Sequence, residues 1–193
     1  MAKKKLQFRP DRMESSLWSK LYITKQQRKT ILKWALYAAL CIGTLVVQDV
    51  ILGRFHLFGG TVDITPMLLM MICVLEGAEV GGVFTLATSV FYYYSGSAPG
   101  TYCILFLTCL GILAAMFRQN FLQRSFSAHW ICTVVVGFVY QIGVFCMGLF
   151  LTHTHPGRVT AFLMNGLLGA AALPLLYPAL TAIGKIGGTP WKE

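Results

Sequence analysis

Two glutamates, Glu76 and Glu79, stand in a short link between two apolar runs of a chain that has few charged residues. Carboxylates at such a place could bind a basic surface of a partner protein, or form ion pairs with Arg118 and Arg124 of the same chain. The alternative is a link whose glutamates are hydrated by water. Exposed ion pairs contribute only ~0–1 kcal/mol, which favours the hydrated link.

A third carboxylate, Asp49, follows Gln48 near the end of an apolar run. A carboxylate inside a membrane helix is costly, and such residues often take part in moving ions or protons. Near a helix end the same side chain can reach water or a cation such as Arg54. We interpret Asp49 as an interfacial residue, because the apolar runs offer no acidic or histidine partners for a proton relay.

The remaining candidates for chemistry are three histidines. His56, His153 and His155 could supply imidazole ligands to a metal ion, but the pair spaced by one residue precedes Pro156 and Gly157, as in an ordinary loop. The sequence shows no Ser/His/Asp arrangement, no phosphate-binding glycine loop and no paired catalytic carboxylates. It therefore predicts no enzyme activity, no cofactor and no metal.

Composition indicates that these residues are positioned by helices in lipid. Of 193 residues, 56% are hydrophobic and only 12% are charged, about half the charged fraction of a soluble domain. Six cysteines lie within the apolar runs without any Cys-x-x-Cys pair, so we interpret them as small buried hydrophobic residues. Ten of the sixteen Lys and Arg lie in residues 1–33. Nucleic-acid binding is one explanation of a basic tail, but the apolar runs behind it favour an anionic membrane surface.

Six apolar runs predict an all-α integral membrane protein with a six-transmembrane-helix bundle. Residues 1–33 form a basic cytoplasmic segment, residues 34–183 the helical domain and residues 184–193 a short cytoplasmic tail. The second run has only a dozen or so residues against about 20 for a perpendicular crossing. We expect loop residues to lengthen it, or the bilayer to thin there. The predicted helices occupy residues 34–52, 64–75, 80–94, 101–117, 130–151 and 159–183.

The distribution of Lys and Arg predicts the orientation of these helices. With the amino terminus in the cytoplasm, the inner segments hold fourteen of these residues and the outer loops hold two, Arg54 and Arg158. This bias places both termini in the cytoplasm and the chain in a cell membrane as a multi-pass protein.

Small residues repeat every four positions and predict close helix packing. Ala35, Ala39 and Gly43 form such a stripe on the first predicted helix, and two further pairs lie at the link between the second and third. A turn rich in serine and glycine then follows the third helix. The residues that we predict to pack helices or contact a partner are Ala35, Ala39, Gly43, Glu76, Gly77, Glu79, Gly81, Gly82, Gly96 and Gly100.

Four motifs together resemble the family of the bacterial rod shape-determining protein MreD. They are VQDVIL (47–52), ITPMLL (64–69), EGAEVGGVF (76–84) and SGSAPG (95–100), and the resemblance covers residues 46–118. The family usually carries an acidic residue directly after the proline and an aspartate at the end of the third helix. Here Met67 and Tyr92 occupy these places, so any role of those carboxylates does not carry over.

The resemblance implies a six-helix fold similar to the S components of energy-coupling-factor vitamin transporters. It also implies a non-catalytic scaffold in the cell-wall elongation machinery of the bacterial plasma membrane. The implied direct partner is MreC, and the wider complex would include MreB, RodA and its class B penicillin-binding transpeptidase.

Two further classes of function remain open at this stage. The stripe of Ala35, Ala39 and Gly43 also resembles the surface with which S components contact their membrane partner. A transporter subunit of that kind should hold a buried polar pocket for a vitamin. Asp49 and the loop histidines are few polar residues to line such a pocket. An intramembrane enzyme would need a cluster of ionisable residues in the helices, and the sequence shows none.

Overall fold

The computed structural model describes residues 25–54, 56–57, 60–121, 125–151 and 154–186. Most of the predicted segment 1–33 and of the predicted tail 184–193 lies outside these ranges. The described part is helical apart from one hairpin of two-residue strands. Its elements are α2 (Lys25–Val50), η1 (Leu52–Arg54), β1 (His56–Leu57), β2 (Gly60–Thr61), α3 (Thr65–Glu76), α4 (Ala78–Tyr94), α5 (Tyr102–Phe121), α6 (Phe126–Phe150), η2 (Pro156–Arg158) and α7 (Val159–Ile186).

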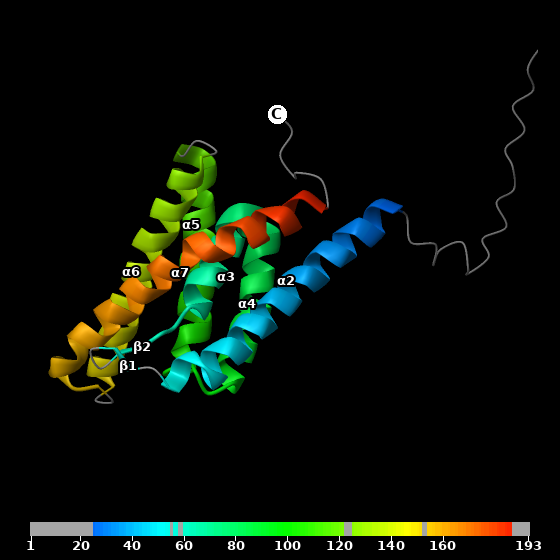
Figure 1. Ribbon diagram of the computed structural model, residues 1–193. Coiled ribbons are helices and arrows are strands. Elements are labelled where there is room, and N and C mark those ends of the chain that lie inside the picture. Colours follow the sequence, from blue (N-terminus) through cyan, green and yellow to red (C-terminus); the bar gives the residue numbers. More distant parts are fainter. Residues whose placement is uncertain (1–24, 55, 58–59, 122–124, 152–153, 187–193) are drawn as a thin grey trace, which may run out of the picture.

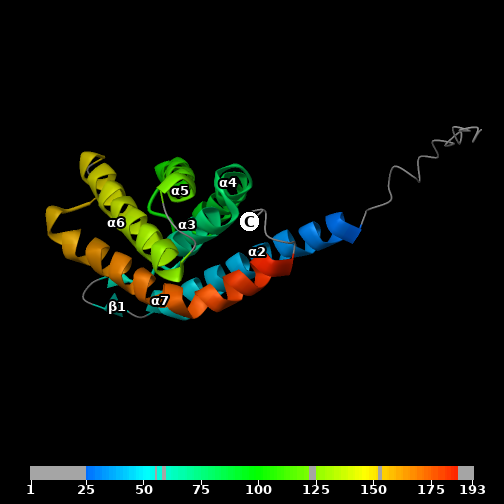
Figure 2. The same cartoon turned by 90° about the horizontal axis from the view of Figure 1, so that it is seen from above.

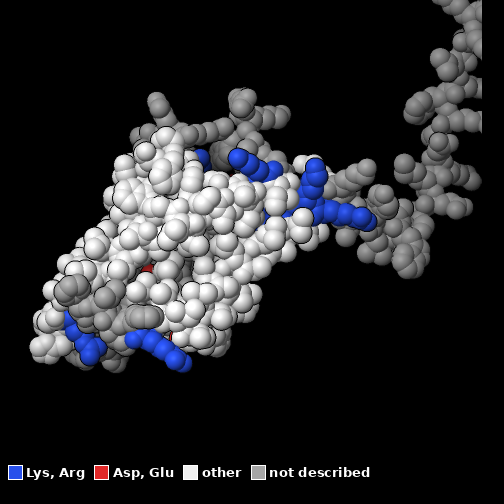
Figure 3. Space-filling model, viewed as in Figure 1, with Lys and Arg blue, Asp and Glu red and all other residues white. Residues whose placement is uncertain are grey.

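The helices have the length and composition of a membrane protein. Four of them, α2, α5, α6 and α7, are long and apolar enough to cross a bilayer. On the face shown in Figure 3, Lys and Arg side chains gather at two ends of the molecule, and the broad belt between them shows none. The prediction of a helical membrane protein is thus confirmed. The six crossings and the cytoplasmic position of both termini stay predictions.

The short helix α3 is the centre of the bundle. It contacts each of the other five helices and lies between α4, α5 and α6 on one side and α2 and α7 on the other (Figures 1 and 2). Residues 65–74 are all buried, as expected for a helix that is apolar on every side. We expected loop residues or bilayer thinning to compensate for its 12 residues. Loop residues do not lengthen the helix, and the chain itself surrounds residues 65–74; a thinner bilayer stays a prediction.

Both ends of α3 are held by side chains from other helices. At its start the Gln48 side-chain oxygen accepts hydrogen bonds from the backbone N–H groups of Ile64 and Thr65, each at 3.1 Å. These donors have no partner within the helix, so Gln48 supplies a cap that the local sequence lacks. At its end the Arg118 guanidinium donates to the Val74 carbonyl at 2.9 Å, where a cation also suits the helix dipole.

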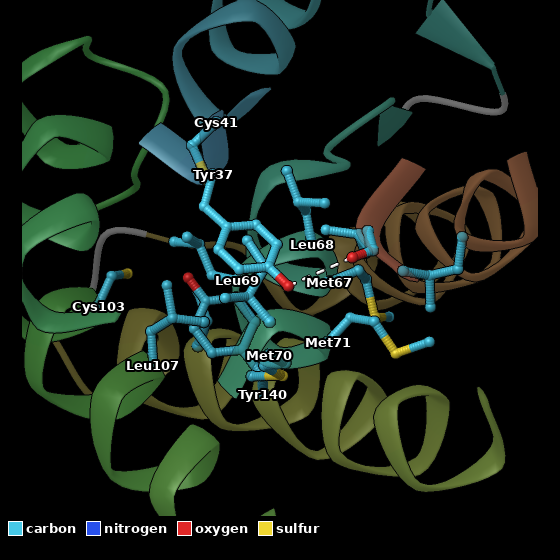
Figure 4. Close-up of a cluster of buried hydrophobic side chains, with 14 residues drawn as sticks. Tyr37, Cys41, Met67, Leu68, Leu69, Met70, Met71, Cys103, Leu107 and Tyr140 are labelled. Carbon is cyan, nitrogen blue, oxygen red and sulfur yellow. Dashed lines mark hydrogen bonds between the residues drawn. The ribbon is translucent and has the colours of Figure 1, made fainter. Parts of the chain in front are cut away.

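Glycines permit the close contacts around α3. A Cβ atom on Gly81 would lie 2.9 Å from the Cα of Cys73, so α4 touches the backbone of α3. The side chain of Met67 fills the space beside Gly137 and Gly169, where added Cβ atoms would lie 2.0 and 2.9 Å from it. Met67 therefore packs within the core cluster (Figure 4).

Candidate functional site

A buried ion pair lies at the end of α3. Lys33 of α2 pairs with Glu76, and both side chains are only 6% exposed. The Tyr37 hydroxyl donates to the other oxygen of Glu76 at 2.7 Å and also lies 3.3 Å from the Leu180 carbonyl oxygen of α7 (Figure 4). One cation and one hydroxyl thus satisfy the glutamate and join three helices.

This arrangement corrects the interpretation of Glu76 as part of a hydrated link. Glu76 is buried rather than hydrated, and its cation is neither of the two arginines that we considered. Arg118 bonds to the backbone of α3, and Arg124 lies outside the described residues. Glu79, by contrast, is exposed. Gly77 between them has a φ of 101°, a conformation that favours glycine and ends α3 directly before α4.

A polar cavity lies at the opposite end of α3. Its volume is about 490 Å³, within the usual range of sites for small molecules. Its lining comes from α2, α6 and α7, from the connection between α2 and α3, and from the connection between α4 and α5. Small red spots of carboxylate, recessed among uncharged residues, are visible on the surface of this face of the molecule (Figure 3). The polar lining residues include Gln48, Asp49, Asp63, Ser97, Tyr140, Gln141 and Asn165.

Asp63 is the charged residue deepest in this cavity. One carboxylate oxygen accepts a hydrogen bond from the Tyr92 hydroxyl, while the other is enclosed without a hydrogen-bond partner. No cation pairs with it among the described residues. Burial raises the pKa of Asp63 to about 6, because desolvation outweighs the lowering effect of the polar groups of Tyr92, Gln48 and the Thr65 backbone. Tyr92 of α4 thus binds an aspartate supplied by the connection before α3.

Asp49 lines the same cavity nearer its opening. Its carboxylate accepts a hydrogen bond from the Ser97 hydroxyl, and its side chain is exposed, as expected for an interfacial residue. Gly96, with a φ of 81°, turns the chain after α4 so that Ser97 comes back to α2. Gly100 lies in the next turn, where an added Cβ would meet the Tyr102 ring at 2.4 Å. Both glycines therefore shape the connection between α4 and α5.

Sequence reasoning missed the core of this cavity. Asp63 was assigned only to a loop, and Tyr140 and Asn165 were not considered. The signal that could have found Asp63 is its place two residues before Thr65, the start of a helix with proline in its first turn. An acid at that place is favoured by the helix dipole. Tyr140 and Asn165 lie in long apolar helices, and the one local signal near them is the polar pair that Tyr140 forms with Gln141.

The predicted stripe on α2 faces away from the bundle. Ala35, Ala39 and Gly43 are all exposed, and no other atom lies within 4 Å of the place where a Cβ on Gly43 would be. The beginning of α2 also extends beyond the rest of the described helices (Figure 1). Gly81 and Gly82, in contrast, pack inside the chain, where a Cβ on Gly82 would meet Ile112 at 2.7 Å. Of the small residues predicted to pack helices, those of the α2 stripe are exposed on a helix face, whereas Gly81 and Gly82 are buried.

The remaining residues considered in the sequence are the loop histidines and the cysteines. The His155 ring accepts a hydrogen bond from the Gly157 backbone at 3.4 Å, and His153 lies outside the described residues. Within the described ranges, no group of three or more His, Cys, Asp or Glu could hold a metal ion. Four of the six cysteines are buried as expected, but Cys109 and Cys146 are exposed on apolar helix faces.

Comparisons with protein-family models, curated proteins and solved structures find no match to this chain.

Proposed function

We propose that the chain is a non-catalytic membrane scaffold of the MreD type, which binds MreC and joins it to the peptidoglycan-synthesising complex. The observation that carries this proposal is the exposed stripe of small residues on α2. Ala35, Ala39 and Gly43 allow another helix to come close to the α2 backbone, and close approach is the main source of helix association in lipid. MreB, RodA and its class B penicillin-binding transpeptidase would join at the level of the whole complex.

The position of α2 supports this role. Only 17% of its most apolar stretch is buried within the chain, less than in α5 or α6, where the share is 39%. Yet its inner face is firmly attached through Tyr37 and Cys41, which are 0% and 1% exposed. A helix held on one side and free on the other can bind a second protein without rearranging its own fold.

Substitution of the stripe tests the proposal. A Cβ added at Gly43 would point into open space, and Gly43 is exposed, so Gly43→Leu should retain folding while it keeps a partner helix away. We expect recovery of co-expressed MreC with the tagged full chain to fall at least tenfold. The matched control is Ala87→Leu, at an exposed small residue of α4. Undiminished recovery with Gly43→Leu, or no MreC recovered with the unmodified chain, would contradict the proposal.

A second candidate function is supported by the polar cavity. An S component of an energy-coupling-factor transporter needs such a cavity for its substrate, and it would use the same stripe on α2 to contact its membrane partner. The two functions differ in what the unmodified chain retains from membranes of its own organism. A scaffold retains MreC, whereas an S component retains a coupling membrane protein together with its ATPases.

A further inference from the structure

Three residues that line the cavity at the start of α3 each carry an enclosed, unsatisfied polar atom. These atoms are Oδ1 of Asp63, the hydroxyl oxygen of Tyr140 and Oδ1 of Asn165, each enclosed and without a nitrogen or oxygen hydrogen-bond partner. The thiol of Cys103 lies beside the Tyr140 hydroxyl. Only one other such atom, Nε2 of His129, occurs in the part of the chain that the structure describes. Folded proteins leave few buried polar atoms unpaired. Three of them around one space indicate that something absent from the chain itself completes the site.

The chemistry of these atoms defines what could complete it. The oxygens of Asp63 and Asn165 accept hydrogen bonds, and the Tyr140 hydroxyl can also accept one. Tyr140 is 98% buried as a residue, since only 2% of its surface is exposed. Asp49 adds a second carboxylate near the opening, and none of the described lining residues is basic. The site therefore favours a cation that donates several hydrogen bonds, as a primary ammonium does.

The size and walls of the cavity add a second requirement. About 490 Å³ is much more space than an ammonium group needs. Val62, Pro99, Val144 and Phe162 form an apolar wall beside the polar atoms. A ligand that fills both parts has a charged end and a compact apolar body.

We propose that this cavity binds a small primary amine, with its ammonium group held by Asp63, Tyr140 and Asn165 and its apolar body against Phe162. The site is separate from the α2 stripe, because its lining comes from the end of α2 and from α6 and α7. The proposal goes beyond the scaffold function and does not depend on it. Loss of MreC binding would leave it intact, and loss of amine binding would leave the scaffold intact.

The test uses the purified full chain in lipid nanodiscs and three matched probes. The probes are 2-phenylethylamine, its N,N,N-trimethyl derivative, which has the charge without N–H donors, and 2-phenylethanol, which is neutral. Calorimetric titration at pH 7.5 should show 2-phenylethylamine binding at least tenfold more tightly than either of the others. Equal binding of all three would mean a non-specific solvent pocket and would overturn the proposal. So would the absence of binding by every primary amine in a series from methylamine to 2-phenylethylamine.

Variants identify the site. Asp63→Asn should weaken 2-phenylethylamine at least tenfold, and Tyr140→Phe, which removes only the hydroxyl, should weaken it severalfold. The control is Glu79→Gln, which removes an exposed carboxylate outside the cavity. If Asp63→Asn fails to fold, Tyr140→Phe alone decides. Unchanged affinity in Tyr140→Phe, or an equal loss in Glu79→Gln, would place the amine elsewhere and overturn the assignment.

Discussion

At each end of α3 a tyrosine hydroxyl donates a hydrogen bond to a carboxylate, but among the described residues a cation neutralises the carboxylate at only one of the two ends. At one end a tyrosine, Tyr37, donates to Glu76, and Lys33 neutralises the charge. At the other end Tyr92 donates to Asp63, but no described lysine, arginine or histidine pairs with it. A helix of 12 residues separates them, which is about 18 Å at 1.5 Å per residue.

This difference separates a structural ion pair from an incomplete site. A carboxylate taken out of water needs a cation and hydrogen bonds to offset its lost hydration. Glu76 has both within the chain, so nothing further is needed there and the pair joins α2 to the core. Asp63 has a hydrogen bond but no cation, and its second oxygen is unpaired. The first arrangement suits stability, and the second suits binding a charged molecule from outside.

The largest expected effect comes from breaking the complete pair. Lys33→Met leaves Glu76 as a buried carboxylate without its cation, which costs about 3–5 kcal/mol when one partner of a buried pair is removed. We expect a large fall in the melting temperature of the purified protein in detergent. The double variant Lys33→Met/Glu76→Gln should recover much of it, because the amide of glutamine can still accept from Tyr37.

An exposed glutamate on the neighbouring helix is the control for this prediction. Glu79→Gln removes a carboxylate that the structure leaves exposed, and such surface changes usually stay within about 0.5 kcal/mol. If Lys33→Met melted at the same temperature as Glu79→Gln, the two ends of α3 would not differ in the way described here.

The sequence identified the helices better than it identified either end of α3. Long apolar runs mark helices directly, and each of the six predicted runs falls on a helix of the described chain. Hydropathy does not tell lipid from protein as the surroundings of an apolar helix, so the central place of α3 could not be foreseen. The same limit applies to the glycines, because Gly43 and Gly81 belong to similar patterns, yet one is exposed and the other packs on Cys73.

The sequence also did not predict which polar residues pair with one another across helices. Lys33 is one of ten basic residues at the start of the chain, and nothing in the sequence distinguishes it from the rest. Its pairing with Glu76 joins positions 43 residues apart. The cavity around Asp63 draws its polar atoms from separate helices in the same way. Contacts of this kind depend on how helices pack in space, and local residue patterns do not encode that packing.

A smaller effect of opposite sign is expected at the incomplete end. Asp63→Asn removes a buried charge that has no cation, while its side-chain oxygen can still accept from Tyr92. We expect this variant to melt at the same temperature as the unmodified protein or a few degrees higher at pH 7.5, a gain of about 1 kcal/mol or less. A fall as large as that of Lys33→Met would mean that Asp63 is also part of a complete structural network.

The pH dependence of stability sharpens the comparison further. Asp63 lies in the connection before α3, outside the long helices, and burial raises its pKa to about 6 from the model-compound value of 3.8. Between these two values the folded protein holds a proton that the unfolded chain releases. Stability therefore falls as the pH rises through this window, by at most about 1.4 kcal/mol per pH unit, and is constant with respect to this group above pH 7.

The groups near Asp63 determine how this prediction is measured. Asp49 adds negative charge that favours the protonated form of Asp63, whereas the polar groups of Tyr92, Gln48 and the Thr65 backbone favour the ionised form. Other carboxylates titrate in the same range, so the relevant quantity is the difference in melting temperature between the unmodified protein and Asp63→Asn. That difference should favour the unmodified protein at pH 4.5 and shrink or reverse by pH 7. A difference that stays constant across this range would show that Asp63 is hydrated, and that the two ends of α3 differ less than their contacts indicate.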